Sequence, residues 1–219
     1  MKKYLNDVIA AATIVALMVM IFPVVEPGVV GALTSDRKQV TIRQEITSEI
    51  SMTVGTAGIT MSAPIAGLTG GSATGATTMN VITNNTAGYK VVLTASSSGT
   101  MVNEDATLSN GIIAAYPSAV PQTWAPAVNS SNFGYSVTAG QEDVNQAGTS
   151  AWKNAAGADG TLYANSGAAA ITLLDRATST LSTGANSSLN FQVTLTSNPI
   201  PAVSEGFYTA TTTLTATMN

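Results

Sequence analysis

The residue types that most often carry enzyme chemistry are absent or scattered in this sequence. The chain has no His and no Cys, which removes the imidazole base, the thiolate nucleophile and the usual zinc ligands. Two adjacent acid pairs remain, Glu104-Asp105 and Glu142-Asp143, and a carboxylate pair can hydrolyse a glycosidic bond. Because neighbouring acids in polar loops are usually solvated, we expect no catalytic residue and a protein that is not an enzyme.

The same loops offer oxygen atoms to a cation. Asn103 and Asn145 lie close to the acid pairs in sequence, and Ca²⁺ accepts carboxylate and amide oxygens as ligands. The spacing of an EF-hand loop is absent. We therefore predict no metal site and no cofactor, with calcium binding as the open alternative.

Aromatic residues in an irregular stretch form the candidate binding site. That stretch covers residues 96–167, and the aromatics in it are Trp124, Trp152, Tyr116, Tyr135 and Tyr163. Aromatic rings on loops can stack against sugar rings, which would make the protein a carbohydrate-binding module with a glycan as its partner. The alternative is that each Trp packs under a long loop at the end of the fold.

Lys90 raises a covalent possibility, because a strand Lys can form an isopeptide bond with an Asn beside an acid. The sequence alone does not give the geometry that such a bond requires.

Nucleic acid is not an expected partner, since the chain has 8 basic and 12 acidic residues and the basic ones are scattered. Charged residues make up only 9% of the chain, so electrostatic repulsion between copies is weak.

The N-terminus carries an export segment. Lys2 and Lys3 precede an apolar run, Val8 to Val25, and Val30-Gly31-Ala32 has the small residues of a cleavage site. This pattern predicts a signal peptide over residues 1–32, and a secreted or cell-surface protein. An uncleaved membrane anchor over residues 8–25 is the alternative, which would be the protein's only contact with a membrane.

The first strand prediction follows the export segment. Apolar residues occupy even positions from Val40 to Val54, which predicts extended chain with a period of two. Fifteen residues exceed a usual strand length of about 5 to 6. The excess predicts a strand-donor arm over residues 33–47, in which Val40, Ile42 and Ile46 would complete the sheet of a neighbouring copy. One long strand bent between two sheets, or a helix with Ile42 and Ile46 on one face, are the alternatives.

Further strands alternate with turn sequences. We expect strands at 59–62, 77–83, 89–95, 112–116, 133–137, 171–174, 189–195 and 208–218, a loop over 67–75, and a hairpin turn at Asn84 to Gly88. Thr residues occupy every other position of the last strand, which suits a solvent-facing surface. About eight or nine strands and no long interior helix predict a single all-β domain over 33–219, built as an antiparallel β-sandwich.

Three motifs carry a resemblance to a protein family. They are Thr83-Asn84-Asn85-Thr86-Ala87-Gly88-Tyr89, Phe133-Gly134-Tyr135-Ser136-Val137 and Gly206-Phe207-Tyr208-Thr209-Ala210-Thr211. Over about residues 40–219 the chain resembles the small secreted immunoglobulin-like β-sandwich proteins of bacterial surfaces, loosely similar to WxL-type and pilin-like domains. The resemblance implies an immunoglobulin-like fold and a structural or adhesive role on the cell surface.

The chain departs from the WxL pattern at both of its Trp residues. Neither Trp124-Ala125-Pro126 nor Trp152-Lys153-Asn154 reproduces Trp-x-Leu, so a peptidoglycan-binding role is not carried over. No sorting motif with an apolar tail follows Met218, and we expect no covalent anchoring to the wall. The expected partners are therefore other copies of this chain, a surface partner or a glycan.

Overall fold

The computed structural model describes residues 37–139, 152, 160–165 and 169–219, and over these residues the protein is all-β. The chain divides into two units, Met1–Glu45 and Ile46–Asn219, and every strand lies in the second. The strands are β1 Ile50–Val54, β2 Gly71–Thr83, β3 Tyr89–Ala95, β4 Met101–Asn103, β5 Ile112–Ala115, β6 Gln122–Thr123, β7 Ser131–Thr138, β8 Leu162–Tyr163, β9 Ile171–Arg176, β10 Ala185–Leu195, β11 Tyr208–Thr209 and β12 Thr212–Met218, with a short 3₁₀ turn, Ser96–Gly99, after β3. The prediction of an all-β fold is confirmed.

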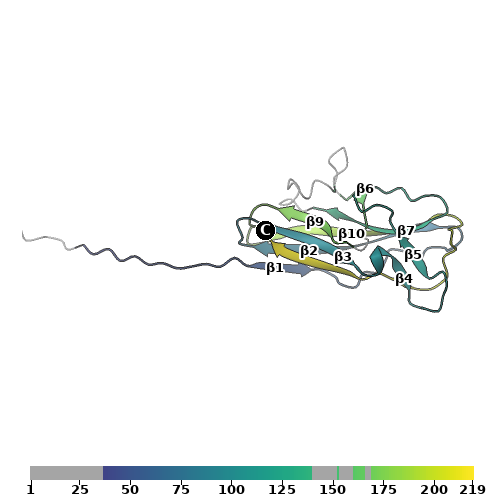
Figure 1. Cartoon of the computed structure of the whole chain (residues 1–219), viewed down its shortest axis with the longest axis horizontal. Helices are drawn as coiled ribbons and strands as arrows, with labels where there is room; N and C mark the ends of the chain where they lie inside the picture. Colours follow the sequence, from purple (N-terminus) through teal and green to yellow (C-terminus); the bar gives the residue numbers. More distant parts are fainter. Residues whose placement is uncertain (1–36, 140–151, 153–159, 166–168) are drawn as a thin grey trace, which may run out of the picture. The chain divides into compact units, whose positions relative to one another are not determined.

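The strands of the second unit form three sheets (Figure 1). The largest has seven strands in the order β1-β2-β10-β7-β5-β4-β11, the next has the order β12-β3-β9, and β6 pairs with β8. All pairs are antiparallel except β5 with β7, which is parallel. The predicted antiparallel arrangement therefore has one exception, at the centre of the irregular stretch.

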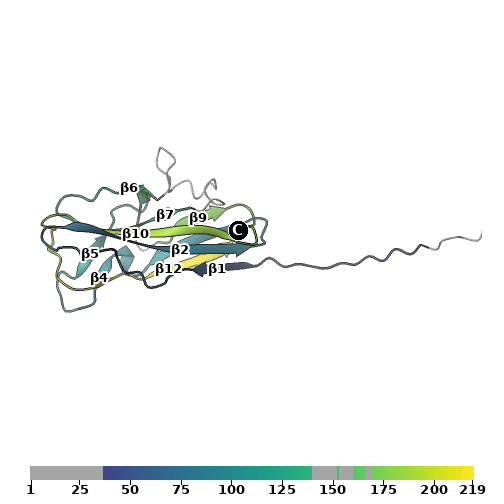
Figure 2. The same cartoon turned by 180° about the vertical axis from the view of Figure 1, so that it is seen from behind.

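One core joins the two larger sheets. Val91, Leu93 and Leu174 come from the three-stranded sheet, and Val137 and Leu189 come from the seven-stranded sheet. All five are fully buried or nearly so. Burying a side chain of this size stabilises the fold by about 1.5–3 kcal/mol, so this shared apolar cluster holds the two sheets together. Figure 2 shows the same strands from behind.

The predicted hairpin between 77–83 and 89–95 is wrong. Both segments are strands, but β2 pairs with β1 and β10, whereas β3 pairs with β12 and β9. The connecting turn therefore carries the chain from one sheet to the other. Gly88 has φ +85°, and a side chain there would collide with the carbonyl oxygen of Arg176, which explains why Gly is needed at this corner.

Two other boundaries differ from the sequence prediction. The expected loop at 67–75 becomes strand from Gly71, because β2 pairs with β10 continuously from Gly71 opposite Leu195 to Val81 opposite Ala185. The expected strand at 59–62 is not a strand, although Ser62 donates its N–H to the carbonyl oxygen of Thr74 at 2.8 Å. Long-range pairing decides both boundaries against local composition.

The predicted strand 208–218 is divided in two. β11 pairs with β4, β12 pairs with β3, and Ala210 and Thr211 lie between them. The five Thr residues at odd positions from 209 to 217 are exposed, as expected. The segment from Tyr208 to Met218 thus forms an edge of both larger sheets.

The predicted signal peptide or membrane anchor, residues 1–32, lies outside the described residues. Among the residues that the structure describes, no helix has the length and apolar character needed to cross a membrane.

Candidate functional site

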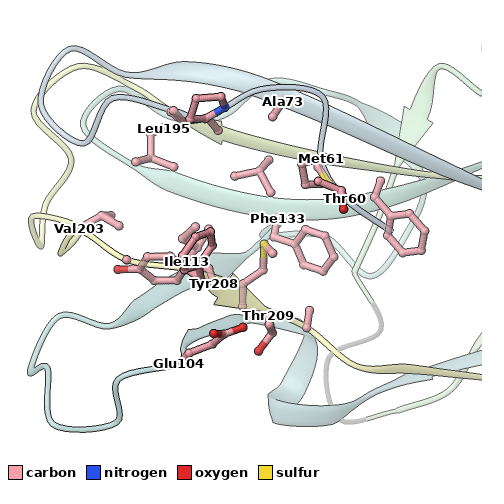
Figure 3. A pocket seen from close by; sticks show the side chains of 18 of the residues that line it. Thr60, Met61, Ala73, Glu104, Ile113, Phe133, Leu195, Val203, Tyr208 and Thr209 are labelled. Carbon is pink, nitrogen blue, oxygen red and sulfur yellow. The ribbon is translucent and has the colours of Figure 1, made fainter. Parts of the chain in front are cut away.

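An apolar groove opens into the core of the second unit (Figure 3). Its volume is about 1200 Å³, which exceeds the roughly 300–1,000 Å³ of common small-molecule pockets. The floor consists of buried core side chains, namely Met101, Phe133, Phe191, Val193 and Leu195. The hydrophobic core is therefore accessible from this side of the protein.

The first wall is the segment that follows β1. Its apolar members Ile59, Met61 and Ile65 are half-buried against the core. A Cβ at Gly75 of β2 would lie 2.7 Å from Cγ2 of Ile59 and 3.1 Å from the Met61 sulfur. Gly75 thus lets this wall lie directly on β2, and a larger residue there would push it away.

The second wall is the segment around β11. Val203, Tyr208 and Ala210 are half-buried in it, and the Tyr208 hydroxyl donates a 2.8 Å hydrogen bond to the carbonyl oxygen of Ser204. Phe207 also lines the groove, and 80% of its surface is exposed. This wall presents apolar side chains that nothing in the described chain covers completely.

The backbone of the second wall has one unpaired edge. The carbonyl oxygens of Phe207 and Thr211 accept hydrogen bonds of 2.9 and 2.8 Å from N–H groups that directly follow β4 and β3. Alternate residues of a strand direct their peptide groups to opposite edges. The peptide groups of Tyr208, Ala210 and Thr212 therefore face the other edge, where no strand pairs with them among the described residues.

Acidic side chains accompany the groove. Glu104 and Glu205 line it, and no basic residue does within the described ranges. Asn103 anchors this corner, since its side-chain amide donates a 3.0 Å hydrogen bond to the carbonyl oxygen of Glu205. The opening thus combines apolar walls with two carboxylates.

Asp105 has a local structural role instead. The hydroxyl of Thr107, at 2.6 Å, and its backbone N–H, at 3.0 Å, both donate to the Asp105 carboxylate. These hydrogen bonds lower the pKa of Asp105, because they stabilise its charged form.

Across the described residues no three acidic, His or Cys side chains gather in a way that could hold a metal ion. Glu142, Asp143 and Asn145 lie outside those residues.

The predicted arm is extended chain rather than strand. Residues 37–49 form neither strand nor helix, and β1 begins at Ile50, so the strand and helix interpretations of residues 40–49 are wrong. The exposed fractions are 80% for Val40, 90% for Ile42 and 83% for Ile46. Three β-branched apolar side chains, all on even positions, are thus left in solvent.

Neither protein-family models, nor curated proteins, nor solved structures match this chain. The groove and the exposed arm are therefore the features on which a functional hypothesis has to rest.

Three of the five aromatic residues proposed for glycan stacking are buried. Trp152, Tyr116 and Tyr135 each have at most 1% of their surface exposed. Trp152 donates its indole N–H to the Thr172 carbonyl oxygen at 3.2 Å, as the packing interpretation of this residue expects. In this conformation their ring faces are closed to a sugar.

Trp124 and Tyr163 are half-buried on the outer face of the seven-stranded sheet. Trp124 stacks on Tyr116 with ring centroids 4.5 Å apart and lies 5.1 Å from Tyr163. Its indole N–H donates to the Thr194 hydroxyl at 3.1 Å, and a Cβ on Gly134 would come within 2.8 Å of the ring. Partial burial raises the pKa of Tyr163. Only these two rings remain for the glycan hypothesis, which stays a prediction.

Lys90 has an acidic partner. Its ammonium lies 3.2 Å from the Asp175 carboxylate, and the Asn219 side-chain amide donates to the same carboxylate at 3.2 Å. Both charged side chains are more than a third exposed. An ion pair in such a setting contributes about 0–1 kcal/mol, and this is the role that the geometry gives Lys90.

The groove has no clear signature in the sequence. Its walls come from Ile59, Met61, Ile65 and Val203, which are isolated apolar residues in segments rich in Gly, Pro, Ser and Ala. Ile59 and Met61 are two residues apart, and this spacing predicts only a short strand. Their common surface depends on contacts between segments about 140 residues apart.

Proposed function

We propose that this protein is an exported structural component of a cell surface, an immunoglobulin-like β-sandwich whose copies join by strand addition. The donated strand is the arm, defined from here on as residues 37–47. The observation that carries this function is the exposure of Val40, Ile42 and Ile46, which occupy alternate positions of a segment that belongs to no strand or helix.

Exposed apolar residues of this size have a thermodynamic cost. Transferring each one from water to an apolar site is worth about 1.5–3 kcal/mol, and single exposed residues are common. Three on the same face of one extended segment are a different pattern, because a strand presents alternate side chains to one surface. Such a segment can add to a sheet edge and bury its apolar face in the same step.

The composition supports an assembling protein. Charged residues make up 9% of the chain, against roughly 25% in a typical soluble domain. Like-charge repulsion between copies is therefore small, and short-range apolar contacts dominate their association. The signal peptide predicted over residues 1–32 supports a location of this assembly outside the cell.

Two charge-adding variants of the arm test this function. In the full exported chain, Ile42→Asp with Ile46→Asp places two carboxylates on the apolar face of the arm. We expect light scattering to find only monomers, because an unpaired buried charge costs several kcal/mol. Under the same conditions we expect the wild-type chain to form higher-order assemblies.

The matched control is Thr41→Asp with Thr47→Asp, which adds the same charge to the opposite face of the arm. This variant is expected to assemble to within about twofold of the wild-type size, since neighbouring residues of a strand face opposite sides. Equal assembly of both variants, or a monomeric wild-type protein, would show that the arm is not a donated strand.

A further inference from the structure

We propose that the acceptor of the arm is the apolar groove together with the open edge of β11 and β12, and that the occupant is the arm of a second copy of this chain. This inference rests on the proposed function, since it names the partner surface of a donated strand. It makes a separate claim, because a donated arm could add to several edges of the fold and the proposed function does not say which edge accepts it.

The two larger sheets have four edge strands, namely β1, β9, β11 and β12. A strand could add to any of them through backbone hydrogen bonds alone. The edge of β11 and β12 differs from the others because residues 207–212 also line the groove. A strand added there would satisfy backbone groups and bury side chains in the same movement.

The edge formed by β11 and β12 suits the spacing of the arm. Strand residues rise about 3.3 Å each, so Val40 and Ile46 lie about 20 Å apart when extended. The same number of residues separates Tyr208 from Leu214. Even positions of that segment are half-buried from Tyr208 to Ala216, so both segments turn alternate residues to one side.

The core already provides the apolar surface that the arm requires. Phe133, Phe191 and Leu195 form the floor, and Ile59 and Val203 come from opposite walls. Figure 3 shows Phe133, Leu195 and Val203 around the same space. An apolar arm residue would therefore meet core side chains on several sides rather than a flat surface.

Charge favours the same pairing. The groove contains Glu104 and Glu205 and no basic residue in the described chain, whereas the arm carries three basic residues, Arg37, Lys38 and Arg43, and one acid, Glu45. Opposite charges on two surfaces raise the rate and the specificity of their association. The two Glu residues lie near β4 and β11, so we expect the basic N-terminal end of the arm at that end of the groove.

Cysteine cross-linking between two different chains tests the acceptor, because the native chain contains no Cys. One chain carries Ala210→Cys in the groove wall, and the other carries Val40→Cys, Ile42→Cys or Ile46→Cys. Adjacent strands lie about 4.8 Å apart, within the Cα separation that a disulfide accepts. After mild oxidation of the mixed full-length chains, we expect a covalent dimer for at least one of these three arm positions.

The control positions are Thr41→Cys and Thr47→Cys, which face away from the groove and should give at least tenfold less dimer with Ala210→Cys. Each single-Cys chain alone measures the background. The arm position that reacts best also reports the direction of the added strand. We expect Ile42→Cys to react best if the basic N-terminal end of the arm lies beside Glu104 and Glu205.

Light scattering on the same samples separates the two proposals. If assemblies form through the arm but no apolar position cross-links above the controls, the groove is not the acceptor and the proposed function stands. If no assemblies form, both proposals fail. A chain that carries both Cys residues tests the remaining possibility. If a disulfide forms only within that chain, the arm fills its own groove and the second-copy occupant is wrong.

Discussion

A chain with a blocked groove is expected to pair one to one with a chain whose arm cannot be donated. Ala210→Trp fills the groove wall but leaves the arm intact, whereas Ile42→Asp with Ile46→Asp disables the arm but leaves the groove open. Each variant alone should be monomeric. Mixed in equal amounts, they should form a species of about twice the monomer mass and nothing larger, because only one arm and one groove still match.

This result would be specific to head-to-tail strand addition. A symmetric dimer made from one self-complementary surface would lose association in both variants and would not recover it on mixing. Thr213→Trp is the matched control, since it adds the same ring to an exposed residue on the outer face of β12; it should assemble like the wild type. Folded variants that remain monomeric in the mixture would contradict the assignment of arm and groove.

The second large effect concerns stability. Leu93 is fully buried at the centre of β3 and belongs to the core shared by the two larger sheets. Leu93→Ala is expected to lower the free energy of unfolding by about 2–5 kcal/mol, because it removes apolar contacts and leaves a cavity. Denaturant unfolding followed by Trp fluorescence gives the value, with the fully buried Trp152 as a reporter.

Thr94 is the control for this change. It is the next residue on the same strand and is exposed, so Thr94→Ala should change the unfolding free energy by no more than about 0.5 kcal/mol. If both substitutions had the same small effect, the face of β3 that carries Leu93 would not be part of a common core.

Alternation along single segments was enough to predict most of the strands. In β10, the residues from Leu189 to Leu195 alternate between buried and half-buried, as their sequence pattern indicates. The last segment from Tyr208 behaves similarly, with its exposed Thr positions. A period of two arises from the geometry of one strand, so it can be interpreted without knowing the partners of that strand.

The pairing of strands could not be predicted in the same way. The sequence from Asn84 to Gly88 specifies a reversal, and a reversal fits both a hairpin and a corner between sheets. The choice depends on β10 and β12, which lie about 100 or more residues further along and pair with β2 and β3. Likewise, Gly71 to Gly75 form strand because β10 pairs with them, although Gly and Ser weaken the local preference for strand.

Of the proposed donor and acceptor, only the donor has a pattern that the sequence alone displays. Val40, Ile42 and Ile46 form a pattern within one segment, and their exposure agrees with the expected arm. The proposed acceptor is the groove, whose walls include Ile59 and Val203, and these residues share no local sequence pattern. The aromatic residues illustrate the same limit, since composition could not distinguish the buried ring of Trp152 from a ring available to a sugar.

Amide hydrogen exchange on the assembled protein tests the central claim most directly, because it reports hydrogen bonding of each backbone segment. We predict that the amides of Tyr208, Ala210 and Thr212, which face the open edge, and alternate amides of residues 37–47 exchange at least tenfold more slowly in assemblies than in the monomeric Ile42→Asp, Ile46→Asp chain. Arm amides that exchange in the assemblies as fast as in the monomer would contradict strand addition through this arm.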